Sequence, residues 1–406
     1  MSGLFLFDDL VAASWKPFTW TRPVGELVYG GCSFRERAER VGGAVCIGHI
    51  APHLAGFDEP DAAAEVNPAA IDASQPRIYL SARFVPDWDA RIEVPDHDAV
   101  LVAGGEPVGM AVVSGSAGPP ADFFDDPAGV ALPTAKRIEI AGRLLTGFWE
   151  LVTGHGRQLE ADMRQLVGGG LPAMPDGVTV LGAKGGGVRL GEGVTIEPGV
   201  VIDCSAGPVW FENDVRVRAF TRIAGPARIG RGSTLLGGTF DGVTVGPHCK
   251  VRGELESSVI LGYSNKAHDG FIGHAVIGRW VNLGALTTNS DLKNNYGYVR
   301  IATPDGEVDT KSMKVGCFLG DHVKTAIGTM LNTGTVVGPG SNLFGSSMPA
   351  KHVAPFSWGG ADESVHGLDR FLGTAATAMS RRDVPLTSGV RAILERAWNA
   401  SRGSDL

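Results

Sequence analysis

Residues 211–235 read FENDVRVRAFTRIAGPARIGRGSTL. An apolar residue stands at every sixth position of this stretch, at Phe211, Val217, Ile223, Ile229 and Leu235. A period of six does not fit an α-helix of about 3.6 residues per turn, and it is typical of a parallel β-helix. Each unit of six forms a short strand and a turn, and its apolar residue points inward and stacks on the same position of neighbouring coils. The stretch therefore predicts a parallel β-solenoid with three faces per coil.

The same period recurs on both sides of this stretch and ends before Pro355. Interruptions at 203–210, 236–244 and 284–318 predict loops that leave the coil, and functional residues often lie on such loops. Further inward positions are predicted at Leu190, Ile196, Ile202, Val245, Val251, Phe271, Ile277, Leu283, Leu319, Thr325, Leu331, Val337 and Leu343.

Before the repeat, the apolar residues follow a different pattern. Short apolar runs at 4–7, 77–80 and 99–102 indicate buried strands. Ser33 followed by Glu36 is a helix-start pattern. Strands that alternate with helices favour an α/β layered domain. We expect a domain over 1–170 with a glycine-rich linker at its end, the solenoid over 171–354, and a helical tail over 355–406 with helices at 369–382 and 388–398.

Composition excludes several functional classes. The formal net charge is −8 and no basic run is present, so a nucleic-acid partner is not expected. No apolar run approaches the roughly 20 residues that span a bilayer, so no membrane association is expected. The five cysteines are scattered without a Cys-x-x-Cys pair, which fits free thiols in a reducing compartment. Together with a first segment unlike a signal peptide, this predicts a cytoplasmic protein.

Three segments carry a resemblance to a known family. The first is Phe7-Asp-Asp together with PFTWTRP at 17–23. The second is 263–296, which begins with YSNKAHDGFIGHAVIGRWVNLGA. The third is 320–360, which begins with GDHVK and ends with FSWGG. The chain resembles the bifunctional N-acetylglucosamine-1-phosphate uridyltransferase / glucosamine-1-phosphate N-acetyltransferase family, and more closely a divergent bacterial branch of sugar nucleotidyltransferases. The resemblance implies a nucleotidyltransferase-like (Rossmann-like) α/β domain before a left-handed parallel β-helix. It also implies a homotrimer with sites between subunits.

The resemblance places His268 on the family's catalytic base. An imidazole with a pKa of about 6.5 can accept a proton from an attacking amine at neutral pH. Lys266 could hold a sugar phosphate as a point charge, and Arg252 resembles the family's phosphate-binding arginine. Each of these residues could instead belong to an ordinary turn.

Polar side chains further along could hold substrate or only form turns. Lys324 is a candidate for binding acyl-CoA phosphates.

A rival interpretation makes three histidines zinc ligands at a subunit boundary, as in hexapeptide carbonic anhydrases. The substrate candidates are Asn282, Asn289, Lys293, Asn294 and Asn295, and the histidines of the rival interpretation are His248, His268, His274 and His322.

In the N-terminal domain, nucleotidyl transfer needs phosphate binders and carboxylates for Mg²⁺. The chain keeps PFTWTRP but lacks the glycine-rich half of the family signature, and Val24 replaces the expected lysine. Lys16, Arg22 and Arg35 could bind phosphate instead, and Asp8 and Asp9 could hold the metal. The same residues could equally be caps and turns of a degenerate domain.

The sequence thus predicts a sugar-nucleotide biosynthesis transferase. Its solenoid would transfer an acetyl or related acyl group from acyl-CoA to an amino-sugar phosphate. Its N-terminal domain would bind a nucleotide sugar, and with Mg²⁺ it could also make one by nucleotidyl transfer to a sugar 1-phosphate. Two alternatives stay open. In one, the chain is a nucleotidyltransferase whose solenoid only trimerises, and in the other it is a non-catalytic nucleotide-sugar-binding scaffold.

Overall fold

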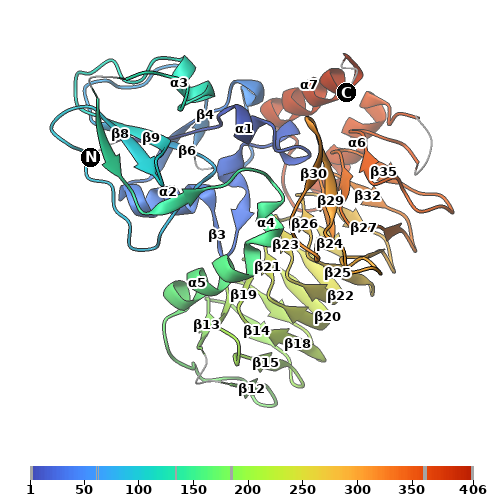
Figure 1. Cartoon of the computed structure of the whole chain (residues 1–406). Coiled ribbons are helices and arrows are strands. Elements are labelled where there is room, and N and C mark those ends of the chain that lie inside the picture. The colour runs from blue at the N-terminus through green and yellow to red at the C-terminus, as the bar shows by residue number, and fades with distance from the viewer. Residues whose placement is uncertain are drawn as a thin grey trace. The chain divides into compact units, whose positions relative to one another are not determined.

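A computed structural model describes residues 3–60, 62, 64–132, 135–182, 186–359 and 364–403 (Figure 1). The chain divides into two compact units. The N-terminal unit holds residues 1–27, 32–148 and 387–394, and the solenoid unit holds 28–31, 149–386 and 395–406. This division differs from the predicted boundaries at 170 and 355. Helix α5 (His155–Val167) belongs to the solenoid unit because its buried residues, among them Leu159 and Met163, face strands of the solenoid.

The N-terminal unit is built on a mostly parallel sheet in the order β10-β8-β9-β6-β1-β4-β5. The predicted strands at 4–7, 77–80 and 99–102 are confirmed as β1, β6 and β8. Its strands are β1 (Gly3–Phe7), β4 (Cys46–Ile50), β5 (Glu65–Val66), β6 (Arg77–Ser81), β8 (Ala99–Ala103), β9 (Glu106–Val112) and β10 (Lys136–Glu139).

Helix α2 (Phe34–Gly42) begins where the sequence predicts. The Ser33 hydroxyl accepts from the amide of Glu36, and the Glu36 carboxylate accepts from the amide of Ser33. This reciprocal pair satisfies two amides that the first turn leaves without partners. The short helices α1 (Leu10–Ala13) and α3 (Asp122–Asp125) and the antiparallel pair β7 (Phe84–Pro86) and β11 (Gly142–Leu144) complete the unit.

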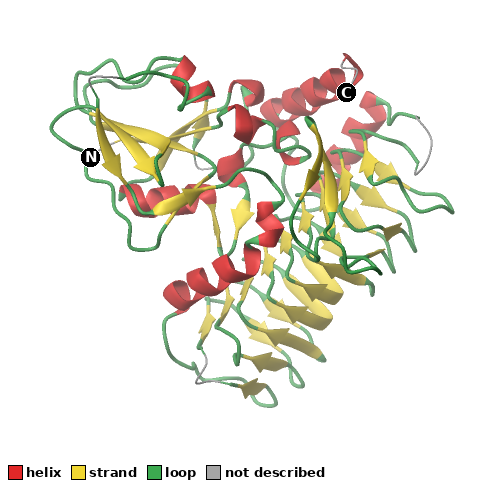
Figure 2. Cartoon of the chain, in the orientation of Figure 1, coloured by secondary structure: helices red, strands yellow, loops and turns green. Residues whose placement is uncertain are grey.

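The second unit is a parallel β-solenoid whose coils stack along three faces (Figure 2). Face A pairs β14 (Thr195–Ile196), β17 (Arg216–Val217), the first part of β20 (Thr234–Asp241), the first part of β22 (Lys250–Glu256), β24 (Asn265–Lys266), β27 (Asn282–Leu283), β32 (Lys324–Thr325) and β35 (Asn342–Leu343). Face B pairs β12 (Thr179–Leu181), β15 (Val201–Asp203), β18 (Thr221–Ala224), the later parts of β20 and β22, and β25 (Phe271–Gly273).

Face C pairs β13 (Val188–Leu190), β16 (Val209–Phe211), β19 (Ala227–Ile229), β21 (Thr244–Val245), β23 (Val259–Ile260), β26 (Val276–Ile277), β31 (Cys317–Leu319), β34 (Thr335–Val337) and β36 (His352–Val353). A further parallel pair, β28 (Thr288–Asn289) with β33 (Met330–Leu331), lies beyond β25. The predicted solenoid and its three faces are confirmed. Its handedness stays a prediction.

The solenoid core is the inward stack that the hexads predict. Phe211, Ile223, Ile229 and Leu235 are fully buried in one apolar cluster. One position was misplaced, because Ile272 points inward and pairs with Leu255, while the predicted Phe271 is half-buried.

Two predicted interruptions are also corrected. Residues 236–241 continue strand β20, because Gly237 and Gly238 adopt positive φ angles that bend the strand around a corner. Only part of 284–318 leaves the coil, as the antiparallel hairpin of β29 (Arg300–Thr303) and β30 (Gly306–Asp309).

Both predicted tail helices are confirmed, as α6 (Leu368–Ser380) and α7 (Ser388–Gly403). Helix α6 buries Phe371, Ala375 and Met379, which are spaced four residues apart on one face. Met379 packs on Tyr263 and Trp280 of the solenoid, and the Phe371 ring lies 5.7 Å from that of His322. The helix is therefore fixed along the solenoid by its apolar face. Within the described part of the chain, no helix is long and apolar enough to cross a membrane.

Candidate functional site

A row of polar side chains runs along face A of the solenoid. Lys250 pairs with Asn265, Asn265 with Asn282, and Asn282 with Lys324, on consecutive strands of the sheet. Neighbouring strands of a sheet lie about 4.8 Å apart, so these four side chains form a regular row, which we call the polar ladder. Each member points outward because the next residue along its strand fills the inward stack.

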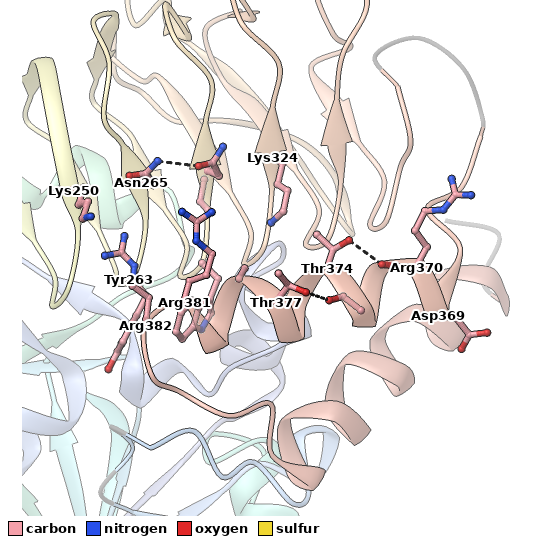
Figure 3. A pocket seen from close by; sticks show the side chains of 15 residues that line it. Lys250, Tyr263, Asn265, Lys324, Asp369, Arg370, Thr374, Thr377, Arg381 and Arg382 are labelled. Carbon is pink, nitrogen blue, oxygen red and sulfur yellow. Dashed lines mark hydrogen bonds between the residues drawn. The ribbon is translucent and has the colours of Figure 1, made fainter.

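Helix α6 lies opposite the polar ladder, and a cavity of about 650 Å³ separates them. We call this cavity the ladder groove. Figure 3 shows Lys250, Asn265 and Lys324 on strands of the solenoid, with Thr374 and Thr377 of α6 across from them. From the helix and the residues after it, the groove is lined by Asp369, Arg370, Gly373, Thr374, Thr377, Ala378, Arg381 and Arg382.

The ladder groove is strongly cationic. Its described lining holds Lys250, Lys324 and three arginines against a single carboxylate, that of Asp369. Burial lowers the pKa of Lys324 to about 8. A charged ammonium held in such a place costs free energy that an anionic ligand would offset. The groove is therefore suited to a ligand that carries several negative charges.

One end of the ladder groove is aromatic. The rings of Tyr263 and Trp280 stack with centroids 4.3 Å apart, and both line the groove. Tyr263 also lies 5.0 Å from the His248 ring, and Trp280 lies 6.3 Å from that of His322. Both rings are buried, and Met379 of α6 packs on them, so this stack anchors the helix to the solenoid.

His268 lies apart from the groove lining. Its side chain is exposed in the loop 267–270, between strands β24 and β25. The Arg252 Nε atom lies 3.0 Å from Oδ1 of Asp269, beside His268. Lys266, which the sequence assigned to a sugar phosphate, is instead 3% exposed and donates hydrogen bonds to the carbonyl oxygens of Arg252 and His268. The structure thus brings Arg252, Lys266 and His268 together, but with Lys266 facing the interior.

The predicted substrate-binding residues between positions 282 and 295 have different environments in the structure. Asn282 is exposed in the ladder groove. Asn289 is 1% exposed, and its amide group bonds the backbone of Gly273 through both its oxygen and its nitrogen, at 3.0 and 2.9 Å. We therefore revise its assignment from substrate binding to a link between coils. Asn294 and Asn295 are exposed, and the Lys293 ammonium donates to the carbonyl oxygen of Tyr298 in the same loop.

The four histidines of the zinc interpretation are spread over different environments. His248 and His322 belong to the aromatic row, and His274 Nδ1 lies 2.7 Å from Oδ2 of Asp291. Among the residues that the structure describes, no group of three or more histidine, cysteine or acidic side chains could hold a metal ion. The zinc interpretation, which places its ligands at a subunit boundary, stays a prediction.

Asp8 and Asp9 follow strand β1 in the N-terminal unit, and both are buried. Asp8 Oδ1 lies 2.9 Å from Nε2 of His49, and both Asp8 oxygens face the amide of Val24. Asp9 caps helix α1 by accepting from the amide of Ala12. Its two oxygens also lie 2.9 Å from Nε of Arg83. Mg²⁺ needs carboxylate oxygens that are free to coordinate it. These contacts do not fit that need, and we revise Asp9 to a helix cap and ion-pair partner.

The predicted phosphate binders of this unit are also engaged. Arg22 is buried in an ion pair with Glu59 at 2.7 Å, and Arg35 contacts Glu26 at 2.7 Å. Lys16 donates to the carbonyl oxygen of Thr19 and lies over the Trp20 ring. Burial lowers the pKa of Lys16 to about 8, although the Asp8 carboxylate acts in the opposite direction. Of these three side chains, Lys16 alone has no carboxylate within ion-pair distance among the described contacts.

Sequence reasoning missed the helix side of the ladder groove. The missed residues recur at intervals of three or four along α6, which is the spacing of one helix face. That spacing was visible in the sequence, but the partner of the face was not, because the strands opposite are far away in the chain. The missed lining residues are Arg370, Thr374 and Thr377 on α6, Arg381 and Arg382 directly after it, and Lys250 and Asn265 on the strands opposite.

Two comparisons with known proteins relate the chain to sugar-nucleotide enzymes. Residues 4–169 match a family model described as sugar nucleotidyl transferase. The chain is also similar to a bifunctional sugar-1-phosphate nucleotidylyltransferase/acetyltransferase of Sulfurisphaera tokodaii, with 27% identity over 100 residues. That match spans 25% of each protein, so about a quarter of the relative's length is covered. The resemblance recognised in the sequence is confirmed by this family model over residues 4–169 and by this distant bifunctional relative.

Proposed function

We propose that the chain is a transferase of sugar-nucleotide biosynthesis whose solenoid transfers an acyl group from acyl-CoA to an amino-sugar phosphate. The cationic ladder groove is the observation that carries this proposal. Coenzyme A combines a diphosphate, a ribose phosphate, an adenine ring and a long flexible arm. The lysines and arginines of the groove suit the phosphates, and the amides of Asn265 and Asn282 suit polar groups of the arm.

In the proposed reaction, the amine nitrogen of the sugar attacks the thioester carbonyl carbon. A C–N bond forms, the C–S bond breaks, and the electron pair leaves with the sulfur. His268 accepts the proton that the amine loses, and the released thiolate takes up a proton as coenzyme A leaves. The exposure of the imidazole supports this role, because an incoming sugar can reach it.

His268 does not line the ladder groove of its own chain. The proposed homotrimer resolves this separation, because the groove of one subunit would then supply acyl-CoA to His268 of the next. Arg252, at the edge of the same loop, would contact the sugar phosphate once its bond to Asp269 opens. A trimer, acyl-CoA as co-substrate and a cytoplasmic location remain predictions.

A second candidate function is nucleotidyl transfer to a sugar 1-phosphate by the N-terminal unit. The family match over residues 4–169 favours it, and the solenoid would then serve only for assembly. The contacts of Asp9 with Arg83 and of Arg22 with Glu59 argue against a metal site and a phosphate site at these residues. We therefore rank it second, and we derive no step through Mg²⁺.

Thiol release from acetyl-CoA in the presence of glucosamine 1-phosphate tests the proposal. We expect turnover in the unsubstituted protein and its loss in His268→Ala. His352→Ala is the matched control, because His352 is an exposed histidine of strand β36 in the same solenoid. Sedimentation would verify that the assembly is retained. Unchanged turnover in His268→Ala would remove the histidine from the mechanism. Pyrophosphate release from a nucleoside triphosphate and a sugar 1-phosphate, without any thiol release, would favour the second candidate.

A further inference from the structure

A lysine lies inside the solenoid at a position that the repeat assigns to apolar residues. Lys266 stands six residues after Ile260 and six before Ile272, and both isoleucines are buried. On face A it pairs with Val251 of the preceding coil, in the inward stack that continues to Leu283. Burial lowers the pKa of Lys266 to about 8, and the Asp269 carboxylate acts in the opposite direction. Because an apolar residue would be favoured here by packing alone, the ammonium group needs a specific reason to be present.

The ammonium group of Lys266 joins two corners of the solenoid. Its Nζ atom lies 2.9 Å from the carbonyl oxygen of Arg252 and 2.9 Å from that of His268. The space for it depends on Gly253, where a Cβ atom would lie 2.9 Å from Nζ. Gly253 and Gly270 both have positive φ angles, of 97° and 132°, which turn the chain at these corners. The site is therefore shaped around the lysine.

The backbone of the loop 267–270 is held at further points. The carbonyl oxygen of Asp269 accepts from the amide of Leu286 at 2.8 Å, and that of Gly270 accepts from the amide of Glu254 at 3.1 Å. The Asp269 side chain is paired with Arg252 on the outside. At His268 itself, the Lys266 ammonium group donates a hydrogen bond to the carbonyl oxygen from inside the coil. The imidazole thus projects into solvent from a backbone that is fixed on both sides.

We propose that Lys266 is a positioning residue, whose buried ammonium group fixes the main chain of His268 and so sets the direction of the imidazole toward the acceptor amine. This inference rests on the proposed function, because it gives a catalytic use to the fixed loop. It replaces the assignment of Lys266 to a sugar phosphate. A side chain that is 3% exposed, with two carbonyl partners, does not reach a ligand outside the coil.

The variant Lys266→Met separates positioning from folding. Methionine has a similar length and suits an inward position of the repeat, so the coil should stay intact while both ties to the carbonyls are lost. We expect kcat for acyl transfer to fall about 10- to 100-fold, since a small displacement of a catalytic group has effects of that size. The KM for the sugar phosphate should change by less than about twofold, because the lysine does not contact the substrate.

Val251→Ala is the matched control, because Val251 neighbours Lys266 in the same inward stack. This substitution weakens the core without removing either tie, so kcat should stay within about twofold of that of the unsubstituted protein. If Val251→Ala lowers kcat as strongly as Lys266→Met, loss of core packing explains the effect and the proposal is overturned.

Hydrogen exchange provides a measurement that does not depend on activity. The amides of Glu254 and Leu286 donate to carbonyl oxygens of the loop, so they should exchange about tenfold faster in Lys266→Met. The amide of Asn282, which donates to Val323 on another coil, should be unchanged. Unchanged exchange at Glu254 and Leu286, or an unchanged kcat, would overturn the proposal. If the unsubstituted protein shows no acyl transfer, the proposed function fails, and the exchange data still decide whether Lys266 holds the loop.

Discussion

The side chains of Asn265 and Asn282 are joined across two coils, with Nδ2 of Asn265 donating to Oδ1 of Asn282 at 3.0 Å. Because its oxygen accepts this bond, Asn282, which lines the ladder groove, keeps its amide nitrogen to donate to an anion or a carbonyl. The bond thus gives the polar ladder a fixed direction. The groove presents donors to its ligand, in keeping with the lysines and arginines around it.

The direction of this bond leads to a prediction for Asn282→Asp. The new carboxylate still accepts from Asn265, so the coil should keep its shape, but it adds a negative charge where an anion is expected. Calorimetry with acetyl-CoA should show binding weakened by about tenfold, or about 1.4 kcal/mol. Asn332→Asp is a suitable control, since Asn332 does not line the groove and its oxygen accepts from the amide of Thr333. Equal binding by both variants would contradict an anion site at the ladder.

Lys324 is expected to contribute directly to binding. Lys324→Met removes a partly buried cation from the groove, and hydrogen bonds to charged groups contribute about 1.5–3 kcal/mol. The dissociation constant for acetyl-CoA should therefore rise by roughly 10- to 150-fold. Lys311→Met serves as the control, because that lysine lies on the exposed hairpin and pairs with Asp309. Loss of affinity in both variants would indicate a general effect of net charge.

The pH dependence of binding follows from the same lysine. The pKa of Lys324 is lowered to about 8 by burial, and a bound anion raises it by favouring the ammonium form. Affinity for acetyl-CoA should be level below pH 8, where the free protein already carries the charge. It should fall as the pH rises above 8, because the free protein then has to take up a proton on binding. Titrations from pH 7 to pH 9.5 would measure this, and Lys324→Met should remove the fall.

The buried pair of Asp9 and Arg83 predicts a stability effect in the N-terminal unit. Arg83→Met leaves the Asp9 carboxylate buried without its cation, which costs about 3–5 kcal/mol. Urea unfolding should show this loss, whereas Arg91→Met should have little effect because Arg91 bonds only nearby carbonyl oxygens among its described contacts. If Asp9 bound Mg²⁺ instead, Mg²⁺ would raise the melting temperature and Asp9→Asn would abolish that rise.

Much of the fold was readable from the sequence because it is encoded locally. A residue every six positions sets both the turn and the inward stack, so Ile223 and Ile229 could be placed in the core without knowing their neighbours. The six-residue period did not identify the inward residue where that residue is polar. Lys266 was not recognised as a stack position, and Phe271 was placed inward because it stands six residues before Ile277, whereas the structure places Ile272 inward.

The sequence by itself thus determined the solenoid, the α/β unit before it and the two tail helices. Only the tertiary structure decided which polar side chains have partners and which face a cavity. Asp9 and Arg83 are 74 residues apart in the sequence. Lys324 faces helix α6 across the ladder groove because Phe371 and Met379 pack the helix against the coils. Such contacts depend on the packing of distant segments, and the free energy of a charge depends on what surrounds it, so no local pattern could reveal them.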